Sequence, residues 1–262
     1  MSIARGTLGP LPYAALGDGP PVAVLAGLSP TAGFEGDTMV RATAGPFAAL
    51  ARRLFVFNRR PGLPRGMTMA ELAAEHAEAL RAIGDGPVDV IGTSTGGSIA
   101  QQLAADHPGV VHRLVLVSTA CRLGPHGRDL QRRAAARVRA GADGQALALL
   151  AASIVPPRRG QLAAGLAGRL LHRRLAPGGL ADMATTIEAE DAFDLARCPP
   201  IRAPTLILAG RDDRFYAPEL FEETAALIPG AVLHVFPRRG HITVMRDRGF
   251  RPALTSFLSG RG

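Results

Sequence analysis

The sequence predicts an α/β protein with a mostly parallel sheet, helices on both faces of that sheet, and a helical cap inserted between two strands. Six short apolar runs are bounded by turn residues, and most are continuous runs of Val, Ile, Leu and Ala rather than alternating with polar residues. Such runs are typical of parallel strands that are covered on both faces. Helical patterns separate most of the runs, which indicates right-handed crossover connections.

The expected strands are taken first because they define the sheet. No internal repeat is visible, so each run counts as one strand. The six runs lie at residues 22–26, 54–57, 88–91, 114–117, 205–208 and 232–236. Their lengths are those of ordinary strands, and they fall in an order that leaves room for a helix after most of them.

The helices are expected where apolar residues recur with a period near 3.6. The segment after the second strand has the clearest start, because Thr68 and Glu71 have the spacing of a capping box. Helices are predicted over residues 38–52, 68–83, 96–106, 218–228 and 247–258.

The alternation of strands and helices fails between residues 122 and 200. This stretch contains Ala, Leu and Arg in helical patterns, interrupted by Gly and Pro, and no convincing strand. Residues 122–175 hold eleven arginines and only two acidic residues. We therefore expect an α/β core at 1–121 and 201–262, with 122–200 as a helical cap insertion.

The overall composition is that of a globular protein. The chain has 262 residues, 47% of them hydrophobic and 20% charged, with a net charge of +8 in which every basic residue is arginine. No charge-free stretch reaches the ~18 apolar residues that a bilayer span needs. The start has no basic region followed by an apolar run, so we expect a cytoplasmic protein without a membrane partner. We expect no nucleic-acid partner either, because the chain has no recognised binding motif and no run of aromatic residues.

The two cysteines, Cys121 and Cys198, stand far apart and outside any metal-binding spacing. This pattern indicates two buried thiols rather than a zinc site, a redox pair or a disulfide framework. The sequence thus gives no sign of a metal or an organic cofactor.

One motif carries the strongest chemical signal. Gly92-Thr93-Ser94-Thr95-Gly96 follows the third strand directly and opens the next helix. A sharp strand-to-helix turn that exposes one side chain needs small residues on both sides of it, and Gly92 and Gly96 meet that need. A phosphate-binding loop is disfavoured because neither GxxxxGK[ST] nor GxGxxG is present.

A serine hydroxyl needs a neighbouring base before it can act as a nucleophile. Of the seven histidines, we favour His241, because it stands in a loop just after the last strand, where the active edge of a parallel sheet lies. The other six occur in helical patterns, before or inside strands, or within the insertion: His76, His107, His112, His126, His172 and His234.

The base needs an orienting acid, and two aspartates compete for that role after the fifth strand. Asp212 and Asp213 are adjacent, so both cannot face His241; we favour Asp213. An oxyanion would need backbone donors. Thr95 N–H follows the serine directly, and Leu28 N–H comes from the loop after the first strand. Hydroxyls of Ser29 and Thr31 could add to them.

These segments together resemble the α/β-hydrolase fold family. The matching pieces are VAVLAGLS, LFVFNRRPGLP, VDVIGTSTGGSIAQQLAADHP, RLVLVSTA, APTLILAGRDDRFYAPE and FPRRGHI, in the order that the family has them. The resemblance implies a triad of Ser94, Asp213 and His241, since the family's acid usually stands three residues after a glycine such as Gly210. It also implies backbone donors from Leu28 and Thr95. The chain departs from the family at Ala26-Gly27, where many members have His-Gly.

The expected reaction is hydrolysis of an ester or related acyl bond of a small molecule through a serine acyl-enzyme. A lactonase or C–C bond hydrolase of the same fold is the nearest alternative, and a non-catalytic ligand-binding member is another. If arginines such as Arg132, Arg133 or Arg137 turn inward, the substrate would be anionic. Nucleic-acid binding through the arginine-rich stretch lacks a recognised motif or a run of aromatic residues.

Overall fold

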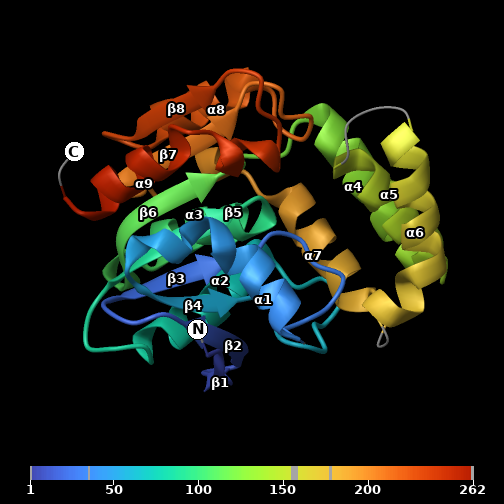
Figure 1. The fold of residues 1–262 in the computed structure, drawn as a ribbon, viewed down its shortest axis with the longest axis horizontal. Helices are drawn as coiled ribbons and strands as arrows, with labels where there is room; N and C mark the ends of the chain where they lie inside the picture. Colours follow the sequence, from blue (N-terminus) through green and yellow to red (C-terminus); the bar gives the residue numbers. More distant parts are fainter. Residues whose placement is uncertain (1, 35, 155–158, 177–178, 261–262) are drawn as a thin grey trace.

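The computed structural model describes residues 2–34, 36–154, 159–176 and 179–260, and these form an α/β fold around one sheet (Figure 1). The sheet has eight strands in the order β1-β2-β4-β3-β5-β6-β7-β8. Their bounds are β1 Ala4–Leu8, β2 Leu11–Leu16, β3 Pro21–Leu25, β4 Arg53–Phe57, β5 Val88–Thr93, β6 Val111–Val117, β7 Thr205–Gly210 and β8 Val232–Phe236. The α/β class predicted from the sequence is confirmed.

The six strands from β3 to β8 are the six predicted ones, and they pair in parallel. The hairpin of β1 and β2 was not predicted; β2 pairs antiparallel with β4 and carries β1 at the edge of the sheet. Four of the five β1 residues are exposed, so this strand has no apolar run to reveal it. Gly9, at φ +52°, forms the tight turn between the two strands.

Helices cover both faces of the sheet. One face packs against α1 (Asp37–Ala44), the 3₁₀ helix η1 (Gly45–Leu50) and α9 (Phe250–Leu258), in a cluster that includes Val40, Phe47 and Leu254. The other face packs against α2 (Met69–Arg81), α3 (Thr95–Asp106) and α8 (Pro218–Leu227). Burial of both faces explains why the parallel strands contain so few polar residues.

Two predicted helices differ in detail. The helix expected over 38–52 ends at Ala44, and η1 continues with Pro46 in its first turn. The helix expected from residue 247 begins at Phe250, because Asp247 lies before it and accepts a hydrogen bond from Gly249 N–H at 2.9 Å. A short 3₁₀ helix, η4 (Thr243–Arg246), lies between β8 and this segment.

The segment between β6 and β7 is helical in its described part, and residues 122–200 are called the insertion below. Its helices are α4 (Pro125–Arg139), α5 (Asp143–Ile154), α6 (Arg159–Leu175) and α7 (Ala181–Ala192), followed by the 3₁₀ helix η3 (Leu195–Arg197). Residues of α4, α5 and α7 share a small core that includes Ala134, Leu147 and Met183. Figure 1 shows α4, α5 and α6 to one side of the sheet, with α7 between them and the rest of the molecule.

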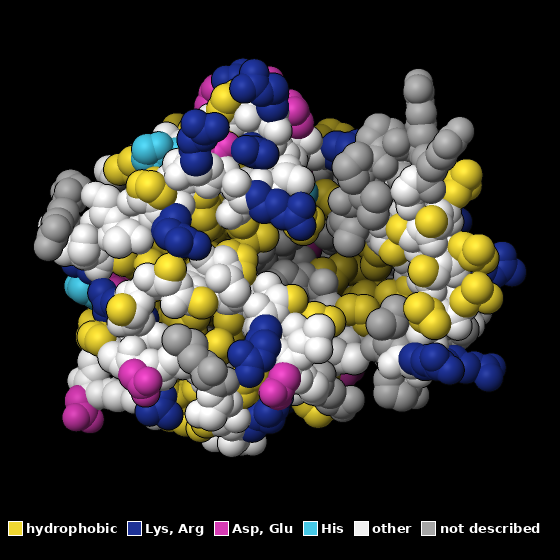
Figure 2. Space-filling view, viewed as in Figure 1, with side chains coloured by type: hydrophobic (Ala, Val, Ile, Leu, Met, Phe, Trp, Pro, Cys, Tyr) yellow, Lys and Arg dark blue, Asp and Glu magenta, His cyan; other side chains and the backbone are white. Residues whose placement is uncertain are grey.

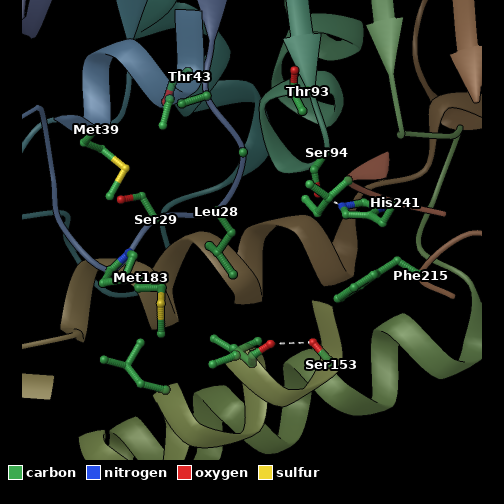
Figure 3. A pocket seen from close by; sticks show the side chains of 18 of the residues that line it. Leu28, Ser29, Met39, Thr43, Thr93, Ser94, Ser153, Met183, Phe215 and His241 are labelled. Atoms are coloured by element: carbon green, nitrogen blue, oxygen red, sulfur yellow. Dashed lines mark hydrogen bonds between the residues drawn. The ribbon is translucent and has the colours of Figure 1, made fainter. Parts of the chain in front are cut away.

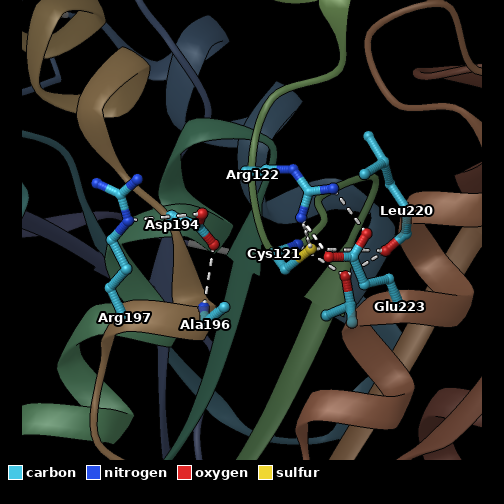
Figure 4. Close-up of polar contacts among 8 residues, drawn as sticks. Cys121, Arg122, Asp194, Ala196, Arg197, Leu220 and Glu223 are labelled. Carbon is cyan, nitrogen blue, oxygen red and sulfur yellow. Dashed lines mark hydrogen bonds and ion pairs between the residues drawn. The ribbon is translucent and has the colours of Figure 1, made fainter.

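The two ends of the insertion meet beside α8 (Figure 4). Leu195 N–H donates to the Cys121 carbonyl at 2.9 Å. Figure 4 shows Arg122 beside Glu223 of α8, with which it forms an ion pair. Cys121 is fully buried, whereas Cys198 is only half-buried, which differs from the prediction of two buried thiols. Burial raises the pKa of both thiols, so neither is activated as a thiolate.

The outer surface of the insertion has both apolar and basic residues (Figure 2). Leu162, Leu166 and Leu170 on α6 are exposed. On α4 and α7, Arg132 pairs with Asp191 at 2.9 Å and Arg139 with Glu188 at 2.6 Å. Among the described residues, no helix is long and apolar enough to cross a bilayer.

Candidate active site

Ser94 occupies a sharp turn between β5 and α3. It is the N-cap of α3 with φ 52° and ψ −125°, a region that side chains rarely adopt, and its N–H bonds to the Val117 carbonyl at 3.0 Å. A Cβ on Gly92 would lie 2.6 Å from the Gly96 carbonyl oxygen, and one on Gly96 would collide with the carbonyl of Leu25. The two glycines therefore allow the backbone contacts that project the Ser94 side chain.

His241 lies in the loop after β8 and reaches Ser94. Its Nε2 is 3.0 Å from Ser94 Oγ, and the side chain is 10% exposed. The backbone of the histidine is held by Ser118 Oγ, which donates to the His241 carbonyl at 2.7 Å. The Phe215 ring packs against the imidazole with centroids 4.6 Å apart. These contacts place an imidazole within proton-transfer distance of the serine hydroxyl.

Asp213 completes a chain of hydrogen bonds. Its Oδ2 is 2.8 Å from Nδ1 of His241, and its Oδ1 accepts from the N–H groups of Phe215 at 2.8 Å and Tyr216 at 3.3 Å. The adjacent Asp212 is exposed, so the structure distinguishes the two aspartates that the sequence left open. A carboxylate in this position favours the imidazole tautomer that has its proton on Nδ1 and a lone pair facing the serine.

Leu28 and Thr95 flank the turn from two sides. Leu28 follows β3 and lines the cavity beside Ser94, while Thr95 is the first residue of α3, where an N–H has no partner within the helix. Both residues also border a second, much smaller cavity with Gly27. The hydroxyls of Ser29 and Thr31 lie 3.4 Å from each other.

Ser94 and His241 open on a cavity of about 380 Å³ between the sheet edge and the insertion. Figure 3 shows Ser94, His241 and Phe215 at one end, Met39 and Met183 at the other, and Leu28 between them. The lining is mainly apolar: Ala26, Gly27, Leu28, Ser29, Pro30, Phe34, Met39, Ala42, Thr43, Thr93, Ser94, Gln131, Leu147, Leu150, Ala151, Ser153, Gly168, Met183, Phe215, His241, Ile242 and Met245. These described lining residues include no Asp, Glu or Arg, and His241 is the one histidine among them.

The arginines considered for substrate recognition do not reach this cavity. Arg132 is 61% exposed and pairs with Asp191, and Arg133 is 51% exposed and pairs with Asp129. Arg137 bonds to the Arg133 carbonyl at 3.1 Å, on the surface of α4. None of the three borders the cavity among its described lining residues, so the hypothesis that they turn inward is wrong for this structure.

A buried carboxylate that sequence reasoning missed lies beside the serine turn. Glu190 of α7 is 1% exposed, and its Oε2 accepts from Thr95 Oγ1 at 2.7 Å and Gln131 Nε2 at 3.1 Å. Its Oε1 accepts from Ser98 Oγ at 2.9 Å and Tyr216 OH at 3.3 Å. Burial raises the pKa of Glu190, and the four hydrogen bonds partly oppose that shift.

The described residues contain no group of three or more His, Cys, Asp or Glu side chains that could hold a metal ion. His76, an alternative base by type, is buried under the sheet in α2, where its Nδ1–H donates to the Leu72 carbonyl at 2.8 Å. Burial lowers the pKa of His76 to about 4. The histidine that meets Ser94 is therefore His241 alone among those the structure describes.

Comparison with known proteins decides the family. The family model described as "Alpha/beta hydrolase family" matches residues 44–253, which is most of the chain. The chain belongs to the alpha/beta hydrolase family. This membership supports an enzyme that performs hydrolysis, and the family's resemblance seen in the sequence is confirmed.

Individual relatives differ in their names. The chain is 32% identical over 220 residues to the polyketide synthase ThaQ of Burkholderia thailandensis, covering 76% of this chain but only 10% of ThaQ. It is 28% identical over 265 residues to the RutD protein of Variovorax paradoxus, which carries the name of a carbamate hydrolase, covering 95% and 96% of the two chains. Among solved structures, a hydrolase from Pseudomonas aeruginosa PA01 has a TM-score of 0.73 at 26% identity, with 98% of each chain covered.

Proposed function

We propose that this chain is a serine hydrolase that cleaves an ester or related acyl bond of a small, uncharged molecule. The observation that carries the proposal is the hydrogen-bond chain Asp213–His241–Ser94, which ends on an apolar cavity. Nucleophile, base and orienting acid within hydrogen-bond distance are what acyl transfer through serine requires.

In the proposed mechanism, Ser94 Oγ attacks the carbonyl carbon while Nε2 of His241 takes the hydroxyl proton. Asp213 stabilises the imidazolium that forms, and the backbone N–H groups of Leu28 and Thr95 bind the oxyanion. His241 then gives its proton to the leaving group, which departs as an alcohol and leaves an ester on Ser94. A water molecule, deprotonated by His241, attacks this ester, and His241 returns the proton to Ser94 Oγ as the acid is released.

The cavity lining supports the proposed substrate class. A lining made mainly of Leu, Met, Phe and Ala residues favours apolar groups, and a cationic side chain that could pair with a substrate carboxylate is missing from the described lining. We therefore favour a neutral acyl group over the anionic substrate considered from the sequence. The insertion provides Leu147, Leu150 and Met183 to the lining, so we propose that it acts as the cap of this site.

Two other substrate types share the same first step. The name carried by RutD suggests a carbamate, whose carbonyl carbon is also attacked by a nucleophile. A lactone or a vinylogous diketone would correspond to the lactonase and C–C hydrolase alternatives. An apolar cavity of about 380 Å³ fits a larger apolar acyl group better than a small carbamate, so esters come first.

The test is covalent labelling of Ser94. Wild type and Ser94→Ala would be incubated with a fluorophosphonate and their intact masses compared. We expect one adduct on the wild type and none on the variant. Turnover would then be measured on short and medium-chain aryl esters, a neutral carbamate ester, a lactone and a vinylogous diketone, with preference for the aryl esters expected.

Failure to label Ser94 with either of two reagents would contradict the proposal. If folded wild type gives no adduct with the fluorophosphonate or with a smaller sulfonyl fluoride, the serine is not activated and the ligand-binding alternative replaces this function. Faster turnover of the lactone or the diketone than of every ester would move the activity to that alternative.

A further inference from the structure

Arg59 is a buried cation whose burial the fold alone does not explain. It lies two residues after the end of β4, is 2% exposed, and its Nε has no hydrogen-bond partner. No carboxylate of the described residues lies within 4.0 Å of its guanidinium. Asp182 acts on it only from a greater distance, and the oxygens of that carboxylate accept from the N–H groups of Gly62 and Leu63. Burying an unpaired charge is costly, so such a residue calls for a reason.

The guanidinium holds the loop that follows β3. Its Nη2 donates to the Ser29 carbonyl at 2.8 Å and to the Pro30 carbonyl at 3.3 Å. The adjacent Asn58 holds the next part of the same loop, donating to the carbonyl of Thr31 at 2.8 Å. Ser29 comes directly after Leu28, the residue whose N–H is the proposed oxyanion donor. Arg59 therefore fixes the loop one residue away from that donor.

Arg59 also lies close to the second proposed donor. Arg59, Gly27, Leu28 and Thr95 border the same cavity of about 10 Å³, the space of about one water molecule. Leu28 and Thr95 thus lie against the same small space as the arginine. At this depth the surroundings have a low effective dielectric, so a positive charge acts strongly on a negative charge that forms nearby.

The arginine remains charged under the conditions of catalysis. Burial lowers the pKa of Arg59 to about 10, and the distant Asp182 opposes the shift. At neutral pH the guanidinium is therefore still protonated. Two carbonyl groups could be held by a neutral amide such as that of Asn58, so the hydrogen bonds do not by themselves require a charge here.

We propose that Arg59 is a positioning residue for acyl transfer: it fixes the Leu28 loop and its buried positive charge stabilises the oxyanion formed at the carbonyl that Ser94 attacks. The inference rests on the proposed function, because it needs an oxyanion at this site. It assigns the residue no contact with the substrate. Its effect should appear in the transition state and not in binding of a neutral ligand.

The test compares Arg59→Gln, which removes the charge, with Arg59→Lys, which keeps it. Three quantities are measured: kcat and KM for 4-nitrophenyl butyrate, the affinity for n-butylboronic acid, which forms an anionic tetrahedral adduct with a serine, and the affinity for neutral butyramide. For Arg59→Gln we expect kcat and the boronic acid affinity to fall roughly tenfold to a hundredfold, with KM and the butyramide affinity within about twofold. For Arg59→Lys we expect the boronic acid affinity within about fivefold of wild type, since its charge remains.

The neighbouring Arg60 provides a matched control. It pairs with Glu75 at 2.7 Å and does not bond to the loop after β3, so Arg60→Gln should leave all three quantities close to wild type. Equal losses of boronic acid and butyramide affinity in Arg59→Gln, or no loss of either, would overturn the inference. If Arg59→Gln does not fold, Arg59→Lys decides, because a loss of boronic acid affinity of more than about tenfold with the charge retained contradicts an electrostatic role.

The outcome can be separated from the fate of the proposed function. Wild type that takes neither the fluorophosphonate nor the boronic acid at Ser94 has no activated serine, and both proposals fall. Wild type that is labelled at Ser94 while Arg59→Gln keeps its kcat and boronic acid affinity leaves the serine hydrolase intact and removes only the role of Arg59.

Discussion

Oε2 of Glu190 accepts a 2.7 Å hydrogen bond from Oγ1 of Thr95, so a carboxylate of α7 lies against the first turn of the helix that begins after Ser94. Both side chains are buried. The same carboxylate binds Gln131 of α4 and Tyr216 after β7. One side chain of the insertion therefore links two of its helices to the serine turn and to the loop that carries Asp213.

Replacing Glu190 should be costly because its partners would lose their acceptor. In Glu190→Leu, four buried donors lose this acceptor, and we expect the free energy of unfolding to fall by about 3 kcal/mol or more. Glu190→Gln keeps one oxygen acceptor and should cost less, about 1–2 kcal/mol. Urea denaturation of the two variants against wild type measures both losses.

Glu188 is the control for this experiment. It lies on the same helix but pairs with Arg139 at the surface, so Glu188→Gln should cost less than about 1 kcal/mol. If Glu190→Leu were no less stable than Glu188→Gln, the buried cluster would not contribute to stability as its contacts indicate.

Asp213→Asn tests the orientation of the imidazole. The amide keeps the shape of the side chain, but an NH₂ group facing Nδ1 of His241 favours the tautomer that has its proton on Nε2. That tautomer cannot accept the Ser94 proton, so we expect kcat for an aryl ester to fall about 10³–10⁴-fold. Binding of a neutral substrate should change little. Steady-state kinetics on 4-nitrophenyl butyrate gives kcat and KM separately.

The adjacent Asp212 gives the matched comparison. Asp212 is exposed, so Asp212→Asn should retain kcat within about twofold of wild type. A larger loss in Asp212→Asn than in Asp213→Asn would contradict the hydrogen-bond chain proposed for catalysis.

The sequence predicted the parts of the fold whose signals are local. The parallel strands appear as apolar runs because they are buried on both faces, and the turn at Ser94 appears as two glycines because backbone atoms approach each other there. Ser94, Asp213 and His241 each come shortly after the end of a parallel strand, namely β5, β7 and β8. Their positions after these strands predicted that they meet at one edge of the sheet.

The features that the sequence could not predict depend on distant partners. Strand β1 is exposed and polar, so only its pairing with β2 makes it a strand. Glu190 meets Thr95 from 95 residues away, and in sequence it is one of several acidic residues in a helix. Arg59 is one arginine among many until folding brings it beneath the loop at Ser29.

The size of the cavity should determine acyl-chain preference. Ala151 of α5 lines the cavity, and a phenyl ring there would fill part of its space. For Ala151→Phe we expect kcat/KM for 4-nitrophenyl octanoate to fall roughly tenfold, since lost burial of a few methylenes is worth a factor of this size. The value for the acetate ester should change by less than about threefold.

Ala163 on α6 serves as the control because it is exposed and does not line the cavity. Ala163→Phe should leave the octanoate-to-acetate ratio unchanged. An unchanged ratio in Ala151→Phe would mean that the acyl chain does not occupy this part of the cavity.

His76 should make stability depend on pH. Burial lowers the pKa of His76 to about 4 in the folded protein, compared with an ordinary value of 6.5. Between these two pH values the unfolded chain binds a proton at His76 and the folded protein does not. Its contribution is fully present above pH 6.5 and is lost as the pH falls toward 4. The unfolding free energy of wild type relative to His76→Leu should fall by about 3 kcal/mol over this range. Urea denaturation of both proteins at several pH values between 4 and 7.5 measures the difference.

His126 separates this effect from the general loss of stability in acid. It is exposed on α4, so His126→Leu should follow the pH dependence of wild type. Carboxylates contribute equally to wild type and to both variants, which leaves the buried imidazole as the source of any difference in slope. A wild-type curve parallel to that of His76→Leu from pH 7.5 to 4 would contradict the prediction, because the imidazole would then gain a proton as easily in the folded protein as in the unfolded chain.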